Sequence, residues 1–528
     1  MSDLPLSQTS GEARTTAPPQ ADSLINRYSA WVSNRANPML VRTLRQELRS
    51  KTFIGIFVLL LVVAALAAIG TAGMVTDSTI STAGRTLYGI LALSWSLVIA
   101  IQAMNTFQAV TRERNEDTWD LLDLTGMGPR LVLRGLLWAN IVQGQLYTAA
   151  LAPFLVMAYL LRGVDLLSIA FALVVMPLAG VATSTLAVFM ASIGNNKASR
   201  AFCQSILGLG LFILWSMSGM LWFALHELEW FFSMFLTRPN EGWLILGLWF
   251  NIWLAFVISM LVLSGALMTH RASDRSSGPR LLWYGLWCNA LCWFFGIAWF
   301  NDRGLSDLGL ALAAFSVFGV LWASVLGLFS VSEPYELSPR QERTITQAPK
   351  WRRWSTLIHG PGAARGRIAF LVMAGMSLIL GVIGFFLRDN QNDGEIVLSA
   401  WVLTGYICML FVITDWCYRG FARRWLDTTG LRRGFILLIA ALWMLVPILL
   451  GAALEMGRMN TSIIALFSPI MGFTEVISGN TTYRETLIIV YSLLGAAAIA
   501  VLIVQSLRLR ITTYRVAASA DDKNPRGE

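Results

Sequence analysis

Twelve long apolar runs constrain this chain more than any other feature of its 528 residues. A helix rising 1.5 Å per residue needs roughly 20 apolar residues to cross a hydrocarbon core of about 30 Å. Inside lipid, a helix satisfies every backbone hydrogen bond within its own segment. We therefore predict an all-α polytopic membrane protein with about 12 transmembrane helices. The runs lie near residues 53–75, 87–110, 135–161, 166–193, 201–225, 243–268, 281–300, 305–331, 368–387, 396–414, 434–454 and 486–507.

The charged residues orient these spans. The net charge is +9, and a basic excess of this size could indicate nucleic acid as a partner. Positive residues, however, concentrate in cytoplasmic loops of membrane proteins. If the N-terminus is cytoplasmic, an even number of spans returns the C-terminus to the cytoplasm. Of the 40 lysines and arginines, only the following then lie outside: Arg85, Arg162, Arg238, Arg303, Arg388, Arg458 and Arg484. We predict two cytoplasmic termini, membrane lipids as partners, and no nucleic acid.

An amphipathic helix is expected just before the first span. Residues 1–36 are rich in Ser, Thr, Pro and Ala and predict a disordered cytoplasmic tail. In residues 37–52, Asn37 can cap a helix and Pro38 can take its first position. One face then carries Leu40, Leu44 and Leu48, and another carries Arg42, Arg45 and Arg49. Such a helix should lie in the headgroup layer, with its arginines near anionic lipid.

The loop after the second span is acidic, although it lies on the basic side of the membrane. At helical spacing its carboxylates fall on one arc, and Trp119, Leu121 and Leu122 fall on the opposite arc. Glycines and a proline then end the helix, and Arg130 and Arg134 precede the next span. We predict a docking hairpin over residues 111–134. The acidic arc consists of Glu113, Glu116, Asp117, Asp120 and Asp123.

These residues resemble the first cytoplasmic loop of ABC-2 type permeases, whose pattern is roughly E-R-E-x-G-T-x-E-x-L-L-x-T-P. The chain departs from it at Asn115, Asp117 and Gly126. The resemblance covers about residues 37–268. It begins at residue 37 because such permeases often open with an Asn-Pro start and an amphipathic elbow helix. The matching residues are Glu113, Arg114, Thr118, Asp120, Leu121, Leu122 and Thr125.

In that family the loop is a coupling helix that fits a cleft in a separate P-loop ATP-binding subunit. The resemblance implies this role for residues 113–125, although an interfacial helix with a solvated acidic face would carry the same residues. It also implies an exporter in a bacterial cytoplasmic membrane. The docking residues would be Glu113, Arg114, Glu116, Asp117, Trp119, Asp120, Leu121 and Leu122.

The family layout divides the chain into two halves. Residues 53–268 match a six-span unit with an external excursion at 226–242. Residues 269–507 contain six more spans with similarly placed long loops, and residues 508–528 form a cytoplasmic tail. The second half is either a degenerate repeat, which would make the chain an internal pseudo-dimer, or an unrelated region. A homodimer is the other arrangement that we keep open.

The spans offer no energy source of their own. Ion-coupled transporters usually carry intramembrane carboxylates, and here Asp307 and Asp415 stand only at span ends. The chain also lacks a G-x-x-x-x-G-K-[ST] loop, since no lysine follows a glycine. We therefore expect a transport subunit that is not an enzyme, has no cofactor of its own, and depends on ATP and Mg²⁺ bound by a partner.

Uncharged polar residues inside the second and third spans could line a path for a polar substrate. They are Gln102, Asn105, Gln108, Asn140 and Gln143. Interhelical hydrogen bonds are the alternative explanation for them.

Two other functional classes stay open beside a permease. A polytopic membrane enzyme, such as a glycosyl- or acyltransferase, would need a catalytic cluster, and only His226, Glu227 and Glu229 offer one. A non-transporting membrane scaffold would need none. Cys288 and Cys292 share a helix face without a His or carboxylate beside them, so we expect packing there and no metal site.

Overall fold

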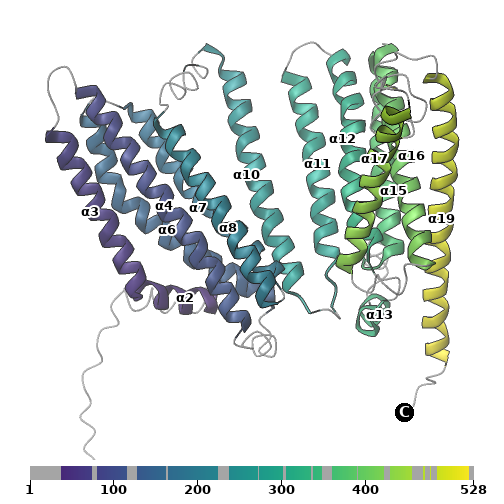
Figure 1. Ribbon diagram of the computed structural model, residues 1–528, viewed down its shortest axis with the longest axis horizontal. Coiled ribbons are helices and arrows are strands. Elements are labelled where there is room, and N and C mark those ends of the chain that lie inside the picture. Colours follow the sequence, from purple (N-terminus) through teal and green to yellow (C-terminus); the bar gives the residue numbers. More distant parts are fainter. Residues whose placement is uncertain are drawn as a thin grey trace, which may run out of the picture. The chain divides into compact units, whose positions relative to one another are not determined.

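The structure, a computed structural model, consists of helices throughout the part of the chain that it describes (Figure 1). Among the described residues there is no β-strand, and twelve helices are long and apolar enough to cross a membrane. The chain is therefore an all-α, integral, multi-pass membrane protein, as predicted. The described residues are 37–73, 80–115, 128–161, 164–194, 196–223, 233, 237–270, 273–300, 305–333, 337–347, 360–388, 391–420, 429–454, 468, 469, 476 and 484–522.

The chain forms two compact units. The first contains residues 1–187 and 204–223, and the second contains residues 188–203 and 224–528. None of the three boundaries falls at residue 268, where the sequence suggested a division, and that division stays a prediction. The first unit draws on α2 (Pro38–Leu48), α3 (Lys51–Gly73), α4 (Ile80–Asn115), α6 (Pro129–Leu160), α7 (Leu166–Ile193) and α8 (Lys197–Phe223). Parts of α7 and α8 belong to the second unit.

The second unit adds eight described helices. Its long helices match the remaining predicted spans. The short α13 is a helix that the sequence analysis did not predict. The helices are α10 (Pro239–Met268), α11 (Ser277–Phe300), α12 (Leu305–Val331), α13 (Pro339–Thr346), α15 (Ala363–Arg388), α16 (Gln391–Arg419), α17 (Thr429–Leu454) and α19 (Arg484–Asp522).

In the first unit, α2 runs across the ends of the long helices, whereas α3, α4 and α6 run side by side (Figure 1). Phe53 of α3 contacts Tyr147 of α6, with ring centroids 5.4 Å apart. The hydroxyl of Tyr88 on α4 donates to the carbonyl of Ser168 on α7 at 3.4 Å. Helix α6 contacts α2, α3 and α4.

Small residues bring the helices of the second unit close together. A Cβ added at Gly384 of α15 would lie 2.6 Å from the carbonyl oxygen of Gly309, so α12 and α15 meet backbone to backbone there. Gly405 of α16 and Gly495 of α19 make a similar approach. Small residues at such crossings permit the close packing that drives helix association in lipid. Buried aromatic rings, including Phe315 and Phe370, fill the core around them.

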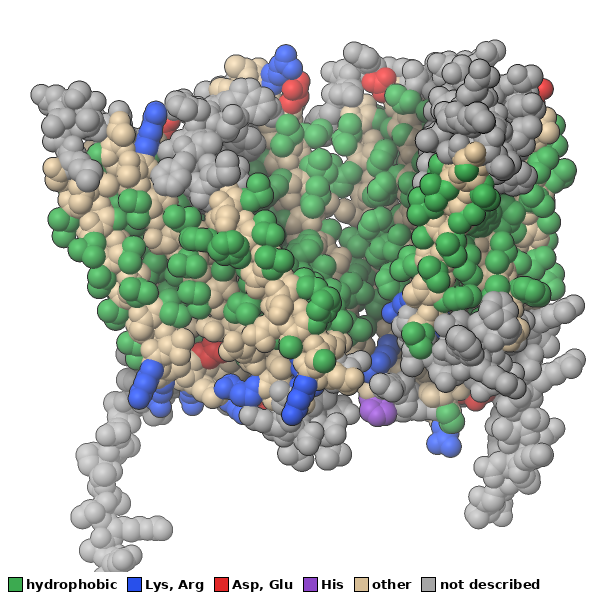
Figure 2. All heavy atoms as spheres, viewed as in Figure 1, with side chains coloured by type: hydrophobic (Ala, Val, Ile, Leu, Met, Phe, Trp, Pro, Cys, Tyr) green, Lys and Arg blue, Asp and Glu red, His purple; other side chains and the backbone are tan. Residues whose placement is uncertain are grey.

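The outer surface of each unit suits a bilayer. Large apolar side chains stay exposed along the spans, for example Leu66 on α3 and Leu449 on α17. Figure 2 shows hydrophobic side chains over the middle of the helices, whereas Lys and Arg gather near the helix ends. Exposed apolar surface on this scale would be unfavourable in water, and its position between polar ends is expected for spans in lipid.

Candidate functional site

The predicted docking hairpin begins as a continuation of α4. That helix runs without interruption to Asn115, so Glu113 and Arg114 lie in its last turn. On the other side of the hairpin, Gly128 is extended and Pro129 takes the first position of α6. The other predicted docking residues lie outside the described part of the chain. They are Glu116, Asp117, Trp119, Asp120, Leu121 and Leu122.

The cap of α2 fastens this helix to the start of α6. As predicted, Asn37 caps the helix, and its side-chain oxygen accepts the backbone N–H of Met39 at 3.0 Å. The amide nitrogen of the same side chain donates to the carbonyl of Leu131 at 2.6 Å. One asparagine therefore caps α2 and also holds it to the first turn of α6, in the second arm of the hairpin.

Gly135 lets α2 and α6 touch. A Cβ added at Gly135 would lie 2.7 Å from Cβ of Met39 and 3.0 Å from the backbone nitrogen of Leu40. Met39 and Thr43 form the buried face of α2 at this contact. Leu40, which the sequence analysis placed on the apolar face of this helix, is half-buried beside this contact. The two helices thus meet where a side chain larger than hydrogen has no room.

An ion pair joins α2 to the other end of the hairpin. The guanidinium of Arg42 lies 3.7 Å from the carboxylate of Glu113, whose residue is only 8% exposed. The Arg42 side chain is 57% exposed, and an ion pair with so exposed a partner contributes about 1 kcal/mol or less. Its effect is therefore mainly to orient α2. Glu113, a member of the predicted acidic arc, is therefore buried and paired with Arg42 of α2, and its docking role stays a prediction.

A carboxylate of α2, Glu47, also lies near the end of α4. Burial raises the pKa of Glu47 above its ordinary value, and the nearby positive charge of Arg112 opposes this shift. Arg112 and Glu113 are neighbours at the end of α4, so α2 presents one charge of each sign to them. This arrangement would fix the direction of α2, which packs on α6, relative to the end of α4.

A polar seam between α4 and α6 lies farther along the same helices. The side chain of Gln102 donates to the carbonyl of Asn140, and the Asn140 side chain donates to Thr106. Asn140 also donates to Ser184 of α7 at 2.8 Å. A Cβ at Gly144 would lie 3.0 Å from the Gln102 amide, so the seam is tightly packed.

The five predicted substrate-path residues differ in burial. Gln102, Asn140 and Gln143 are buried, Asn105 is half-buried, and Gln108 is exposed. The bonds of Gln102 and Asn140 run from helix to helix, which favours the alternative role as interhelical links. The role of these five residues as a substrate path stays a prediction.

The second unit contains an ion pair that the sequence analysis did not find. Arg367 of α15 and Asp415 of α16 are both buried, and a guanidinium nitrogen lies 2.5 Å from a carboxylate oxygen. Arg367 also donates to the side chain of Gln505 on α19 at 3.0 Å. These residues lie at the ends of their spans, 48 positions or more apart, and no local pattern could have paired them.

A second buried arginine binds both ends of the segment between α12 and α15. Arg280 of α11 lies 2.7 Å from Glu333 and donates to the carbonyls of Gly360 and Gly362. Gly362 has a φ of +107°, and its N–H donates to Glu333 at 2.8 Å. Only glycine adopts that backbone conformation readily. The only sign of this contact in the sequence was the Gly-Pro-Gly stretch at residues 360–362 together with an arginine on a neighbouring span.

The rival catalytic cluster, His226, Glu227 and Glu229, lies outside the described residues. Elsewhere in the described chain, no three His, Cys, Asp or Glu side chains lie close enough together to hold a metal ion. Cys203, Cys408 and Cys417 are buried free thiols, whereas Cys288 and Cys292 are exposed on α11.

No protein-family model, curated protein or solved structure matches the chain. The family resemblance therefore depends on the residues of the hairpin and of the elbow helix alone.

Proposed function

We propose that this chain is the membrane subunit of an ABC-2 type exporter in a bacterial cytoplasmic membrane. A separate P-loop ATP-binding subunit would dock on residues 113–125, bind ATP and Mg²⁺, and drive the movement of a substrate through the spans. The observation that carries this proposal is the fastening of α2 to both ends of the hairpin. Arg42 reaches Glu113 on α4, and Asn37 reaches Leu131 on α6.

This fastening would turn a push on the hairpin into a movement of whole helices. An α-helix is stiff along its axis, so a displacement at Glu113 is passed up α4. The seam of Gln102 and Asn140 links α4 to α6 within the membrane, and Asn140 continues that link to Ser184 on α7. The helices that flank the hairpin would therefore move together with α2 when the partner closes on ATP.

Affinity purification of the tagged full-length chain from native membranes tests the proposal. We expect a P-loop ATPase to accompany the wild type and to be lost from Asp120→Lys, which reverses a charge on the predicted docking face. Asp120 is preferable to Glu113, because Glu113 is buried against α2 and its loss would also disturb the fold. The matched control is Glu241→Lys, an exposed carboxylate at the start of α10, where the charges predict the external side.

Four outcomes separate the proposal from its rivals. Loss of the ATPase from Asp120→Lys but not from Glu241→Lys supports the docking role. Absence of any ATPase from the wild type, under conditions that preserve other membrane complexes, contradicts it. A catalytic activity that survives Asp120→Lys and is lost in Glu227→Gln would favour the membrane enzyme, and a partner without ATPase motifs would favour the scaffold.

A further inference from the structure

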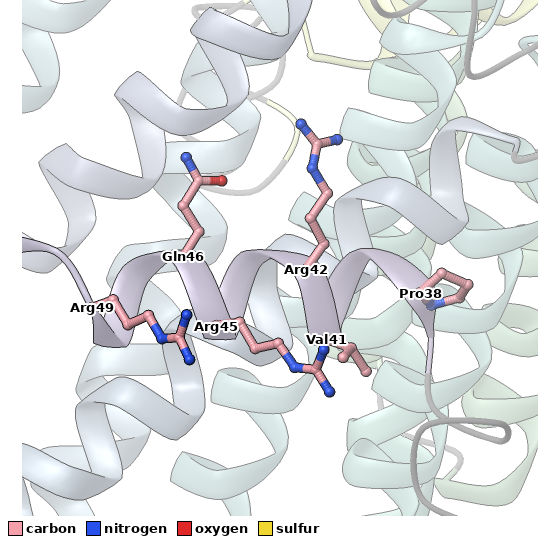
Figure 3. Close-up of a pocket in the computed structure, with 6 residues that line it drawn as sticks. All are labelled: Pro38, Val41, Arg42, Arg45, Gln46 and Arg49. Atoms are coloured by element: carbon pink, nitrogen blue, oxygen red, sulfur yellow. The ribbon is translucent and has the colours of Figure 1, made fainter. Parts of the chain in front are cut away.

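The outer face of α2 is an open surface lined by arginines, and Figure 3 shows its side chains. Arg45 and Arg49 extend together on one side of the helix, whereas Arg42 and Gln46 extend on the other. The described residues of this surface include no carboxylate. They are Pro38, Val41, Arg42, Arg45, Gln46 and Arg49.

Arg45 and Arg49 carry a positive charge that the described chain does not neutralise. The only carboxylate on α2, Glu47, is half-buried near Arg112, and Arg42 is paired with Glu113. Among the described residues, neither Arg45 nor Arg49 forms a salt bridge. Two arginines four positions apart on a helix repel each other, and an anion held between them removes that repulsion.

Apolar surface begins one turn beyond these arginines. The chain leaves α2 at Arg49 and enters α3 through Ser50, whose hydroxyl accepts the N–H of Phe53 at 3.1 Å. The first two turns of α3 then expose Ile54 and Val58 by 52% and 51%. A ligand with an anionic head and apolar chains would satisfy both surfaces at once, whereas a free phosphate would satisfy only the first.

We propose that the Arg45–Arg49 face of α2 binds the phosphate headgroup of an anionic phospholipid, with the acyl chains lying along the first turns of α3. The phospholipid belongs to the leaflet in which α2 lies. The distribution of charged residues predicts that this is the cytoplasmic leaflet. This inference does not depend on the exporter function, because it concerns the membrane and not the ATP-binding subunit.

Lipid retention by the purified full-length chain tests the proposal. The protein is incorporated into nanodiscs of equal phosphatidylcholine and phosphatidylglycerol, extracted in mild detergent, and weighed with its bound lipids by native mass spectrometry. We expect preferential retention of phosphatidylglycerol by the wild type. Arg45→Gln/Arg49→Gln should bind it about 30-fold more weakly, since each arginine near a surface contributes about fivefold. Arg45→Lys/Arg49→Lys keeps the charge and should retain most of the binding.

The matched control is Arg130→Gln/Arg134→Gln. These two arginines are exposed in the first turns of α6 of the same unit, and their removal changes the net charge equally. An equal loss of lipid in this control would show that the attraction is general, and would overturn the proposal. No preference for phosphatidylglycerol in the wild type would also overturn it. Displacement of the bound lipid by millimolar glycerol phosphate would overturn the choice of a lipid as occupant.

Discussion

The contact between α2 and α6 can be tested with a single methyl group at Gly135. In Gly135→Ala the new Cβ would lie 2.7 Å from Cβ of Met39 and 3.0 Å from the backbone nitrogen of Leu40. Carbon atoms pack at about 3.5–4.0 Å, and both neighbours are fixed to the backbone, so α2 must move away by roughly 1 Å. Overpacking of this kind costs about 1–3 kcal/mol.

Gly70→Ala supplies the control for this prediction. Gly70 lies in α3 with nothing within 4 Å of an added Cβ. Alanine is more favourable than glycine inside a helix by about 0.5–1 kcal/mol, and both variants gain this helix-propensity energy. Their difference therefore isolates the clash, and we expect Gly135→Ala to melt about 2–12 °C below Gly70→Ala. Thermal unfolding of the purified protein, followed by tryptophan fluorescence, measures this difference. Equal melting temperatures would refute the close docking of α2.

Three further predictions concern buried polar groups. Burial raises the pKa of Glu47 in the folded chain, so the unfolded chain loses the Glu47 proton at a lower pH than the folded chain does. The stability of the fold therefore falls as the pH rises above the ordinary pKa of 4.5. Glu47→Gln should therefore melt above the wild type near pH 7, with a difference that shrinks toward pH 4.5; a constant difference would contradict this. Asp415→Asn leaves the buried charge of Arg367 uncompensated and should cost about 3–5 kcal/mol in thermal unfolding, more than an apolar replacement of both partners. Asn140→Ala removes two interhelical donors and should cost about 1–2 kcal/mol, whereas the exposed Gln108→Ala should be neutral in the same assay.

The sequence predicted the spans because their signal is local. A run of about 20 apolar residues has one stable form in lipid, and each predicted run corresponds to a described helix. The cap of α2 was predictable for the same reason, since Asn37 and Pro38 are adjacent. The eight-residue α13 was missed, although Ser338 and Gln341 form a capping box at its start.

The partners of the polar residues could not be predicted, because they depend on which helices become neighbours. Glu113 belongs to an acidic arc in the sequence, and only the position of α2 reveals that it is buried against Arg42. Arg367 and Asp415 stand at the ends of different spans, where each alone resembles an interfacial charge. Glycines at crossings, such as Gly384, carry no signal of the helix that they approach.

Site-specific crosslinking in native membranes tests the central claim most directly. A photoreactive amino acid in place of Asp120 would lie on the predicted docking face, and the same group in place of Glu241 would serve as the control. We predict that illumination joins position 120, and not position 241, to a protein with a G-x-x-x-x-G-K-[ST] loop. Crosslinks from position 120 only to lipid, or only to proteins without such a loop, would contradict a coupling role for residues 113–125.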